Sequence, residues 1–448
     1  MDVLYTLKPL YYLSKFVGLA SFSVYFNSRT GENVLRSSGV FNFVQNIYTV
    51  VIFCGITVGF VMCVQDVQTK LSTNPGQVVS HMFSSPANFI TSLMDIILMS
   101  VVNRKQMMKL VMKLFTIDKI LVQGKELKIY QNSRRRMLLE LIIIFGILVP
   151  FLCYDSYFFG RYSSHIYEGM SRFSIVVNLT TVIQFLWAMR FFKHRLSLLN
   201  RKVLSTFSCQ SNSVMRHKYP SHRETEKPFC RRGLSEVKQG CGLTDIFGVF
   251  KEGNIRTLTV LPVSDGKLSG FLHQNTQFDG VSYILNLRIT YNHIYEATIL
   301  ANSVYGISII LTLMHCFVST VSNTYFTFLD NFTNFDQLEK KLSNVGYYIA
   351  THILWIFISV GKTIAISGSC HMVKEESKIL VNNLQKLQLL HPIRSDVLLQ
   401  LQQFSTQVSE NSIHFTAFGF FSVNLSLLYA FIASSVTYVI ILIQFRLN

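Results

Sequence analysis

Seven separate stretches of mostly apolar residues limit what this chain can fold into. They cover residues 40–64, 77–102, 137–158, 170–191, 297–321, 346–366 and 423–445. A helix needs about 20 apolar residues to cross the hydrocarbon core of a bilayer, where its backbone polar groups must be bonded within the helix. The sequence therefore predicts an all-α integral membrane protein with seven transmembrane helices.

The distribution of charge predicts how these helices are oriented. The formal net charge is +17, which by itself would suggest nucleic acid, yet only 15% of the residues are charged. Lys and Arg concentrate in residues 103–136 and 192–296, whereas residues 65–76 and 159–169 carry few of them. Because basic loops remain cytoplasmic, we expect a cytoplasmic N-terminus, an extracellular C-terminus, and membrane lipids rather than nucleic acid as partners.

Polar, helix-forming segments extend several of the predicted spans on the cytoplasmic side. Residues 193–204, 284–306 and 371–390 continue the fourth, fifth and sixth spans, and residues 395–410 form a further helix with Ser395 as its N-cap. We expect these extensions to pack as a cytoplasmic anchor. Three regions follow: 1–366 with helices one to six, 367–414 with the anchor helices, and 415–448 with the seventh helix. Residues 209–279, inside the long loop 192–296, have the composition of a disordered segment.

The seventh predicted helix carries a stripe of small and polar residues. At 100° per residue, six residues fall within about 60° of Thr437, and the opposite side is bulky and apolar. The stripe consists of Ser426, Ala430, Ala433, Ser434, Thr437, Ile441 and Gln444, and Phe445 lies at its edge. This pattern is typical of a pore wall and equally of a close seam between helices. In a pore, Ile441 and Phe445 would flank Gln444 as apolar rings that gate by dewetting.

The chain contains the segments TYVIILIQF (437–445), NTYFTFLD (323–330) and CHMVKEESKIL (370–380). These three segments resemble the insect gustatory receptors, a branch of the insect chemoreceptor family that also contains the odorant receptors. The ending TYVIILIQF (437–445) has the form Thr-Tyr, five apolar residues, Gln-Phe. NTYFTFLD (323–330) is similar to the end of the fifth helix in that family, and CHMVKEESKIL (370–380) to the segment after the sixth. The similarity is concentrated in the last third of the chain.

The resemblance implies a tetrameric ligand-gated cation channel, made of identical or related subunits, in the plasma membrane of sensory dendrites. The seventh helices would line a central pore gated at Ile441, Gln444 and Phe445, and the inner helical ends would hold the tetramer together. A small-molecule tastant, such as fructose or a bitter compound, would bind in the outer half of the bundle formed by the earlier helices. No acidic ring lies on the stripe, so little selectivity among cations is expected.

Polar and aromatic side chains inside the spans are the candidates for contacting this ligand. Aromatic faces with amides and hydroxyls suit a small polar molecule, although each residue could equally make an ordinary contact between helices. The candidates are Gln184, Trp187, His315, Tyr325, Thr351, His352 and Trp355. Lys362 could extend towards the cytoplasm or pair with Asp95, and Asn331 is a glycosylation acceptor if its loop is extracellular.

Other functional classes find little support in the sequence. No H-E-x-x-H, G-x-S-x-G or nucleotide-binding loop occurs, so we expect neither an enzyme nor a cofactor. Cys209, Cys230 and Cys241 lie in one loop with His217 and His222 but lack the spacing of a zinc site. The alternative is a metabotropic seven-helix receptor of inverted topology, without the Asp-Arg-Tyr and Asn-Pro-x-x-Tyr motifs of G-protein-coupled receptors.

Overall fold

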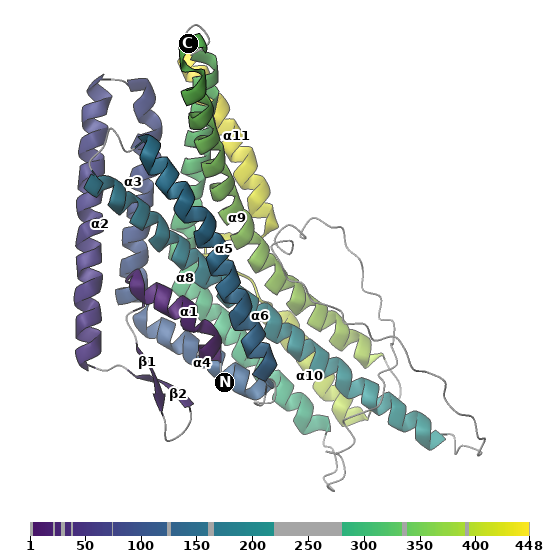
Figure 1. Ribbon diagram of the computed structural model, residues 1–448. Coiled ribbons are helices and arrows are strands. Elements are labelled where there is room, and N and C mark those ends of the chain that lie inside the picture. The colour runs from purple at the N-terminus through teal and green to yellow at the C-terminus, as the bar shows by residue number, and fades with distance from the viewer. Residues whose placement is uncertain are drawn as a thin grey trace, which may run out of the picture. The chain divides into compact units, whose positions relative to one another are not determined.

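The computed structural model describes most of the chain as helix (Figure 1). The described residues are 3–20, 23–27, 32–36, 39–73, 75–122, 127–159, 165–218, 280–333, 338–389 and 394–447. Within them, side chains are not described chiefly in 39–42, 69–83, 206–218, 329–345 and 445–447. The expected disordered segment 209–279 falls mostly outside this range, although its first residues continue a helix as far as Lys218.

Seven helices are long and apolar enough to cross a membrane, which confirms the predicted number. They are α2 (Gly39–Thr73), α3 (Pro75–Ile97), α5 (Leu127–Phe159), α6 (His165–Lys218), α8 (Gly280–Thr333), α9 (Leu338–Gln388) and α11 (Leu425–Leu447). A π-helical turn, η1 (Leu98–Val102), ends α3.

Three further helices and two small hairpins complete the described structure. The helices are α1 (Val3–Phe16), α4 (Arg104–Val122) and α10 (Ser395–Glu410). Strands β1 (Ser23–Asn27) and β2 (Glu32–Arg36) pair antiparallel, as do β3 (Thr416–Ala417) and β4 (Phe421–Ser422). The predicted helix 395–410 has the bounds of α10. The basic segment 103–136, predicted as a loop, instead forms α4 and the start of α5.

Three of the spanning helices are much longer than a bilayer requires. Helices α6 and α8 have 54 residues each and α9 has 51, or about 80 Å at 1.5 Å per residue. The predicted extensions 193–204 and 284–306 are therefore continuous with the spans, and the extension 371–390 is continuous as far as Gln388. Contacts divide the chain into two units, one of them formed by residues 199–289 and 379–410, which contains these helical ends and α10.

Neutral side chains surround an arginine inside this smaller unit. Arg288 on α8 donates from Nη1 to Gln400 at 2.8 Å and to Gln403 at 2.7 Å, and from Nε to Gln407 at 3.2 Å. Asn383 on α9 donates to Asn200 on α6 at 2.9 Å. Side-chain hydrogen bonds therefore join α8 to α10 and α6 to α9, and Phe404 of α10 is fully buried.

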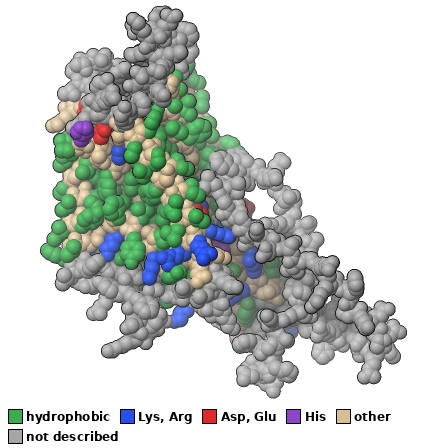
Figure 2. All heavy atoms as spheres, viewed as in Figure 1, with side chains coloured by type: hydrophobic (Ala, Val, Ile, Leu, Met, Phe, Trp, Pro, Cys, Tyr) green, Lys and Arg blue, Asp and Glu red, His purple; other side chains and the backbone are tan. Residues whose placement is uncertain are grey.

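The larger unit contains residues 1–198, 290–378 and 411–448. Its outer surface is apolar: Val51 on α2 is 62% exposed, and Ile142 and Ile147 on α5 are 65% and 68% exposed. Figure 2 shows this apolar surface over α2, α3 and α5, with Lys and Arg side chains gathered along one border. Exposed aliphatic side chains of this kind suit contact with lipid, and basic groups suit the border with headgroups.

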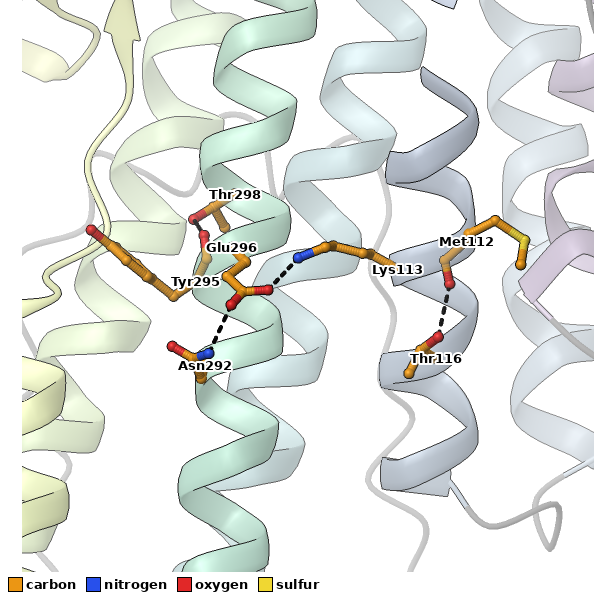
Figure 3. A network of polar contacts seen from close by, with 7 residues as sticks. All are labelled: Met112, Lys113, Thr116, Asn292, Tyr295, Glu296 and Thr298. Carbon is orange, nitrogen blue, oxygen red and sulfur yellow. Dashed lines mark hydrogen bonds and ion pairs between the residues drawn. The ribbon is translucent and has the colours of Figure 1, made fainter. Parts of the chain in front are cut away.

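Buried charge holds α4 in place against the neighbouring helices. Asp118 on α4 pairs with Arg195 on α6 and accepts a hydrogen bond from Tyr130 on α5. The Asp118 and Arg195 side chains are 4% and 5% exposed. A second, more exposed pair joins Lys113 on α4 to Glu296 on α8, where Asn292 also donates to Glu296 at 2.9 Å (Figure 3). The segment predicted as a basic loop is thus in part a packed helix, in which Lys113 and Asp118 pair with residues of other helices.

Close packing of α2 depends on Gly59. A Cβ atom at this position would lie 2.6 Å from Cβ of Met170 on α6 and 3.0 Å from the ring of Phe89 on α3. We expect Gly59→Ala to lower the stability by about 1–3 kcal/mol, because an atom forced into a packed interface displaces its neighbours. The melting temperature of the purified protein measures this.

The matched control is Gly146→Ala on α5, where an added Cβ meets nothing within 4 Å. This change should be neutral or slightly stabilising, since alanine favours helix more than glycine does. Equal melting temperatures for the two variants would contradict the proposed packing at Gly59.

Candidate functional site

Helix α11 presents its predicted stripe outward and packs its opposite side against α8. All seven stripe residues up to Gln444 are exposed: Ser426, Ala430, Ala433, Ser434, Thr437, Ile441 and Gln444. On the other side Leu428 and Phe431 are buried, and the ring of Phe431 lies 5.9 Å from that of Phe317 on α8. The stripe is therefore left for contact outside the subunit, as are the larger side chains of Tyr429, Ile432 and Val436, which are 72%, 48% and 54% exposed.

Two details of the stripe limit what its polar groups can do. The Thr437 hydroxyl donates to the carbonyl of Ala433 in its own helix at 3.0 Å, so Thr437 contributes a small, internally bonded surface. Gln444 is exposed, so its amide offers a donor and an acceptor at the end of the stripe. The side chain of Phe445 lies outside the described part of the chain.

The end of α11 contacts the end of α8 through apolar side chains. Leu442 and Ile443 pack on Tyr325 and Phe326 of α8. These two α11 residues directly follow Ile441, the predicted gate residue. Any movement of the α8 end at Tyr325 and Phe326 would therefore act on the part of α11 that contains Ile441.

His352 and Tyr325, two of the predicted ligand residues, meet at this same place. Nδ1 of His352 on α9 is hydrogen-bonded to Oδ1 of Asn323 on α8 at 2.8 Å. The His352 ring stacks on Phe326 with centroids 6.1 Å apart and planes at 29°. The structure thus connects α9 to α11 through His352, Phe326 and Leu442. Asn323 and Phe326 were not predicted as site residues, although both lie in the quoted segment NTYFTFLD.

Trp355 belongs to a second group, on the side of α9 that faces α5 and α6. Its ring centroid lies 5.0 Å from that of Phe151 on α5. Leu148, Leu152 and Ile175 form the apolar surface beneath it. Nearby, Asp155 on α5 pairs with Arg172 on α6 at 2.5 Å. Thr351, one helical turn from Trp355, is 2% exposed.

Gln184 and Trp187 have partners other than those of Trp355, although Leu179 packs on both apolar clusters. Gln184 donates to the hydroxyl of Ser14 on α1 at 2.6 Å. Trp187 packs on the cluster of Leu10, Met137 and Ile183. These partners come from the N-terminal helix, the start of α5 and α6 itself.

His315 lies near a buried network of hydrogen bonds inside the larger unit. Lys362 on α9 donates to Oδ1 of Asn178 on α6 at 3.0 Å, and Asn178 donates to Asp95 on α3 at 3.4 Å and to Thr312 on α8 at 3.0 Å. Asp95 and Asn178 are fully buried. The expected pairing of Lys362 with Asp95 therefore runs through the Asn178 amide, and this chain of contacts joins four helices.

Two predictions concern residues whose side chains the structure does not describe. Helix α8 includes Asn331 near its end, but the side chain of this predicted glycosylation site lies outside the described part of the chain. Cys230 and Cys241 of the loop 192–296 fall outside the described residues altogether, and Cys209 is described only by its backbone in α6.

Comparison with known proteins identifies relatives of this arrangement. The profile of the 7tm chemosensory receptor family matches residues 7–448. The chain is 29% identical over 184 residues to gustatory receptor 2a of Drosophila melanogaster, which covers 37% of this chain and 41% of that receptor. It is 27% identical over 150 residues to the gustatory receptor for sugar taste 43a of the same fly, which covers 33% of this chain and 32% of that receptor. The alignments thus span less than half of each of these two receptors.

A solved structure agrees with the whole fold. The insect olfactory receptor OR5 from Machilis hrabei superposes with a TM-score of 0.56 over 98% of this chain and 97% of that chain, at 14% identity. The helical architecture with seven candidate spans is therefore shared along the full length. Since the family profile also matches nearly every residue, this chain belongs to the 7tm chemosensory receptor family.

Proposed function

We propose that the protein is a gustatory receptor that works as a ligand-gated, non-selective cation channel. Four subunits, identical or related, would surround a pore lined by α11, in the plasma membrane of sensory dendrites, with the N-terminus cytoplasmic. The observation that carries this proposal is the exposed stripe of α11. Serine, threonine and glutamine side chains find no hydrogen-bond partners in lipid. A stripe of them that one subunit leaves exposed therefore favours contact with water or with another subunit around a central pore.

The ligand would bind near the outer ends of α5, α6, α8 and α9. Trp355 with Phe151, and His352 with Phe326, provide aromatic faces beside hydrogen-bonding groups, as a sugar or a flat bitter compound requires. One relative is described as a receptor for sugar taste, and OR5 has also been solved in complex with eugenol. A ligand that moves α9 at His352 would act through Phe326 on Leu442, next to Ile441.

Currents in a purified system test the proposal. The full chain would be reconstituted into a phosphatidylcholine bilayer without G proteins and exposed to a panel of sugars, including fructose, and bitter compounds. We expect a ligand-evoked cation current with similar permeability to Na⁺ and K⁺, because the α11 stripe carries no acidic residue.

The alternative, a metabotropic receptor of inverted topology, predicts a different outcome. In that case the bilayer stays silent, while cells that supply G proteins respond to the same ligand. The absence of current for the whole panel, in a preparation shown to be tetrameric, would overturn the channel assignment.

A further inference from the structure

Two positively charged side chains share the ring of Tyr5 on α1. The guanidinium carbon of Arg134, at the start of α5, lies 4.4 Å from the centre of the Tyr5 ring. The ammonium of Lys8, one turn further along α1, lies 5.9 Å from the same centre. The cation–π contacts hold both groups in place, but two cations close together repel each other unless an anion is present.

No carboxylate partner balances these charges within the described part of the chain. Arg134 and Lys8 take part in none of its salt bridges, and the buried Nε of Arg134 has no hydrogen-bond partner. Two acids of the helices described here are engaged elsewhere: Asp118 on α4 with Arg195 and Tyr130, and Glu140 on α5 with Arg190. A guanidinium that is fixed in position and lacks an acceptor indicates a site for an anionic group.

The surface beyond this basic group is apolar. Arg135 is exposed, and Leu139 and Ile142 follow at four and seven residues on the same helical face, 58% and 65% exposed. Arg135 therefore lies about 10 Å along the helix from Ile142. On α1, Tyr12 and Phe16 are 63% and 61% exposed. Figure 2 shows Lys and Arg side chains at the border of the apolar surface.

We propose that Lys8, Arg134 and Arg135, with Tyr5, bind the headgroup phosphate of an anionic phospholipid. Its acyl chains would lie along Leu139 and Ile142. The arrangement fits this ligand because charge and apolar surface follow each other in the order of a lipid's head and tail. Basic groups at a membrane border attract anionic lipids, which are concentrated in the cytoplasmic leaflet. The proposed site is independent of channel activity, since α11 takes no part in it.

Lipid preference of the full-length protein tests this site. The protein would be reconstituted in an equal mixture of phosphatidylcholine and phosphatidylserine. Electron paramagnetic resonance of spin-labelled lipids then measures how strongly each lipid is held at the protein surface. We expect a preference for phosphatidylserine, which Arg134→Gln/Arg135→Gln reduces by about fivefold for each arginine, the factor that corresponds to about 1 kcal/mol per basic residue.

Two comparisons show whether a defined site is responsible. Arg201→Gln/Lys374→Gln removes the same charge elsewhere and should leave the preference intact. The single variant Arg135→Gln changes an exposed side chain. It should fold normally and still weaken the preference for phosphatidylserine, even if loss of the Arg134 contact impairs folding of the double variant. Equal losses in the site variant and the charge control, or no preference in the unaltered protein, would overturn the site.

A final arm separates a lipid from free phosphate. Inorganic phosphate added in excess should not displace the spin-labelled phosphatidylserine, because it lacks the acyl chains that contact Leu139 and Ile142. Full displacement would show a phosphate site instead of a lipid site.

Discussion

Asp118→Ala is expected to lower the free energy of unfolding by about 3–5 kcal/mol, which is a large part of the stability of a typical protein. The Asp118 carboxylate is 4% exposed and faces Arg195, which is 5% exposed. Removing the carboxylate leaves the guanidinium of Arg195 buried without an opposite charge, and Tyr130 without its acceptor. The yield of monodisperse protein and its melting temperature in detergent measure the loss.

A surface ion pair supplies the control for this variant. Lys378 pairs with Glu375 at 2.7 Å with side chains 58% and 41% exposed. Because water and salt screen such a pair, Lys378→Gln should cost about 0.3–0.5 kcal/mol at most. The joint variant Asp118→Leu/Arg195→Met should recover part of the lost stability, since apolar residues can replace a buried ion pair. Unchanged stability of Asp118→Ala would show that the pair does not hold α4.

Ile441→Ala and Phe445→Ser are expected to raise the basal current in the absence of ligand by about tenfold or more. In the proposed closed pore, rings of these side chains keep water out, and smaller or polar groups would admit it. A shift of about 1.4 kcal/mol between the closed and open states corresponds to a tenfold change in their ratio. Current per channel at the surface, recorded before ligand is added, is the measurement.

Two variants show whether such a leak comes from the gate. Val436→Ala shortens another exposed aliphatic side chain of α11, but Val436 lies about 100° from Thr437. It should leave the basal current unchanged. Trp355→Ala should reduce ligand sensitivity with a nearly unchanged basal current, because Trp355 contacts Phe151 and lies away from α11. Silent Ile441 and Phe445 variants that reach the cell surface would disprove the gate assignment.

Prediction from sequence succeeded where the bilayer imposes a strict rule. All seven spans were found by length and apolar content, because an unbroken apolar helix is required to cross lipid. It failed for α4, since a helix with Arg104, Lys105 and Lys109 along its sequence shows no long apolar run. Nothing local reveals that Asp118 on this helix meets Arg195, which is 77 positions away in the sequence.

The contacts of the predicted ligand residues were equally beyond local sequence patterns. Gln184 was placed with the outer residues because it lies within an apolar span. It stands 19 positions after the first residue of α6, or about 28 Å along the helix, and there it meets Ser14 of α1. Depth along a helix of 54 residues depends on where neighbouring helices cross it, which the spacing of apolar residues does not specify.

The sequence by itself determined the seven crossings, the helical extensions and the small, polar stripe of α11. These follow from local rules, since hydropathy and the 3.6-residue period act within one segment. Only the tertiary structure decided which face of α11 is buried, that His352 reaches α11 through Phe326, and that Arg134 and Lys8 share Tyr5. Such contacts join residues far apart in the sequence, so they depend on how the helices pack against one another.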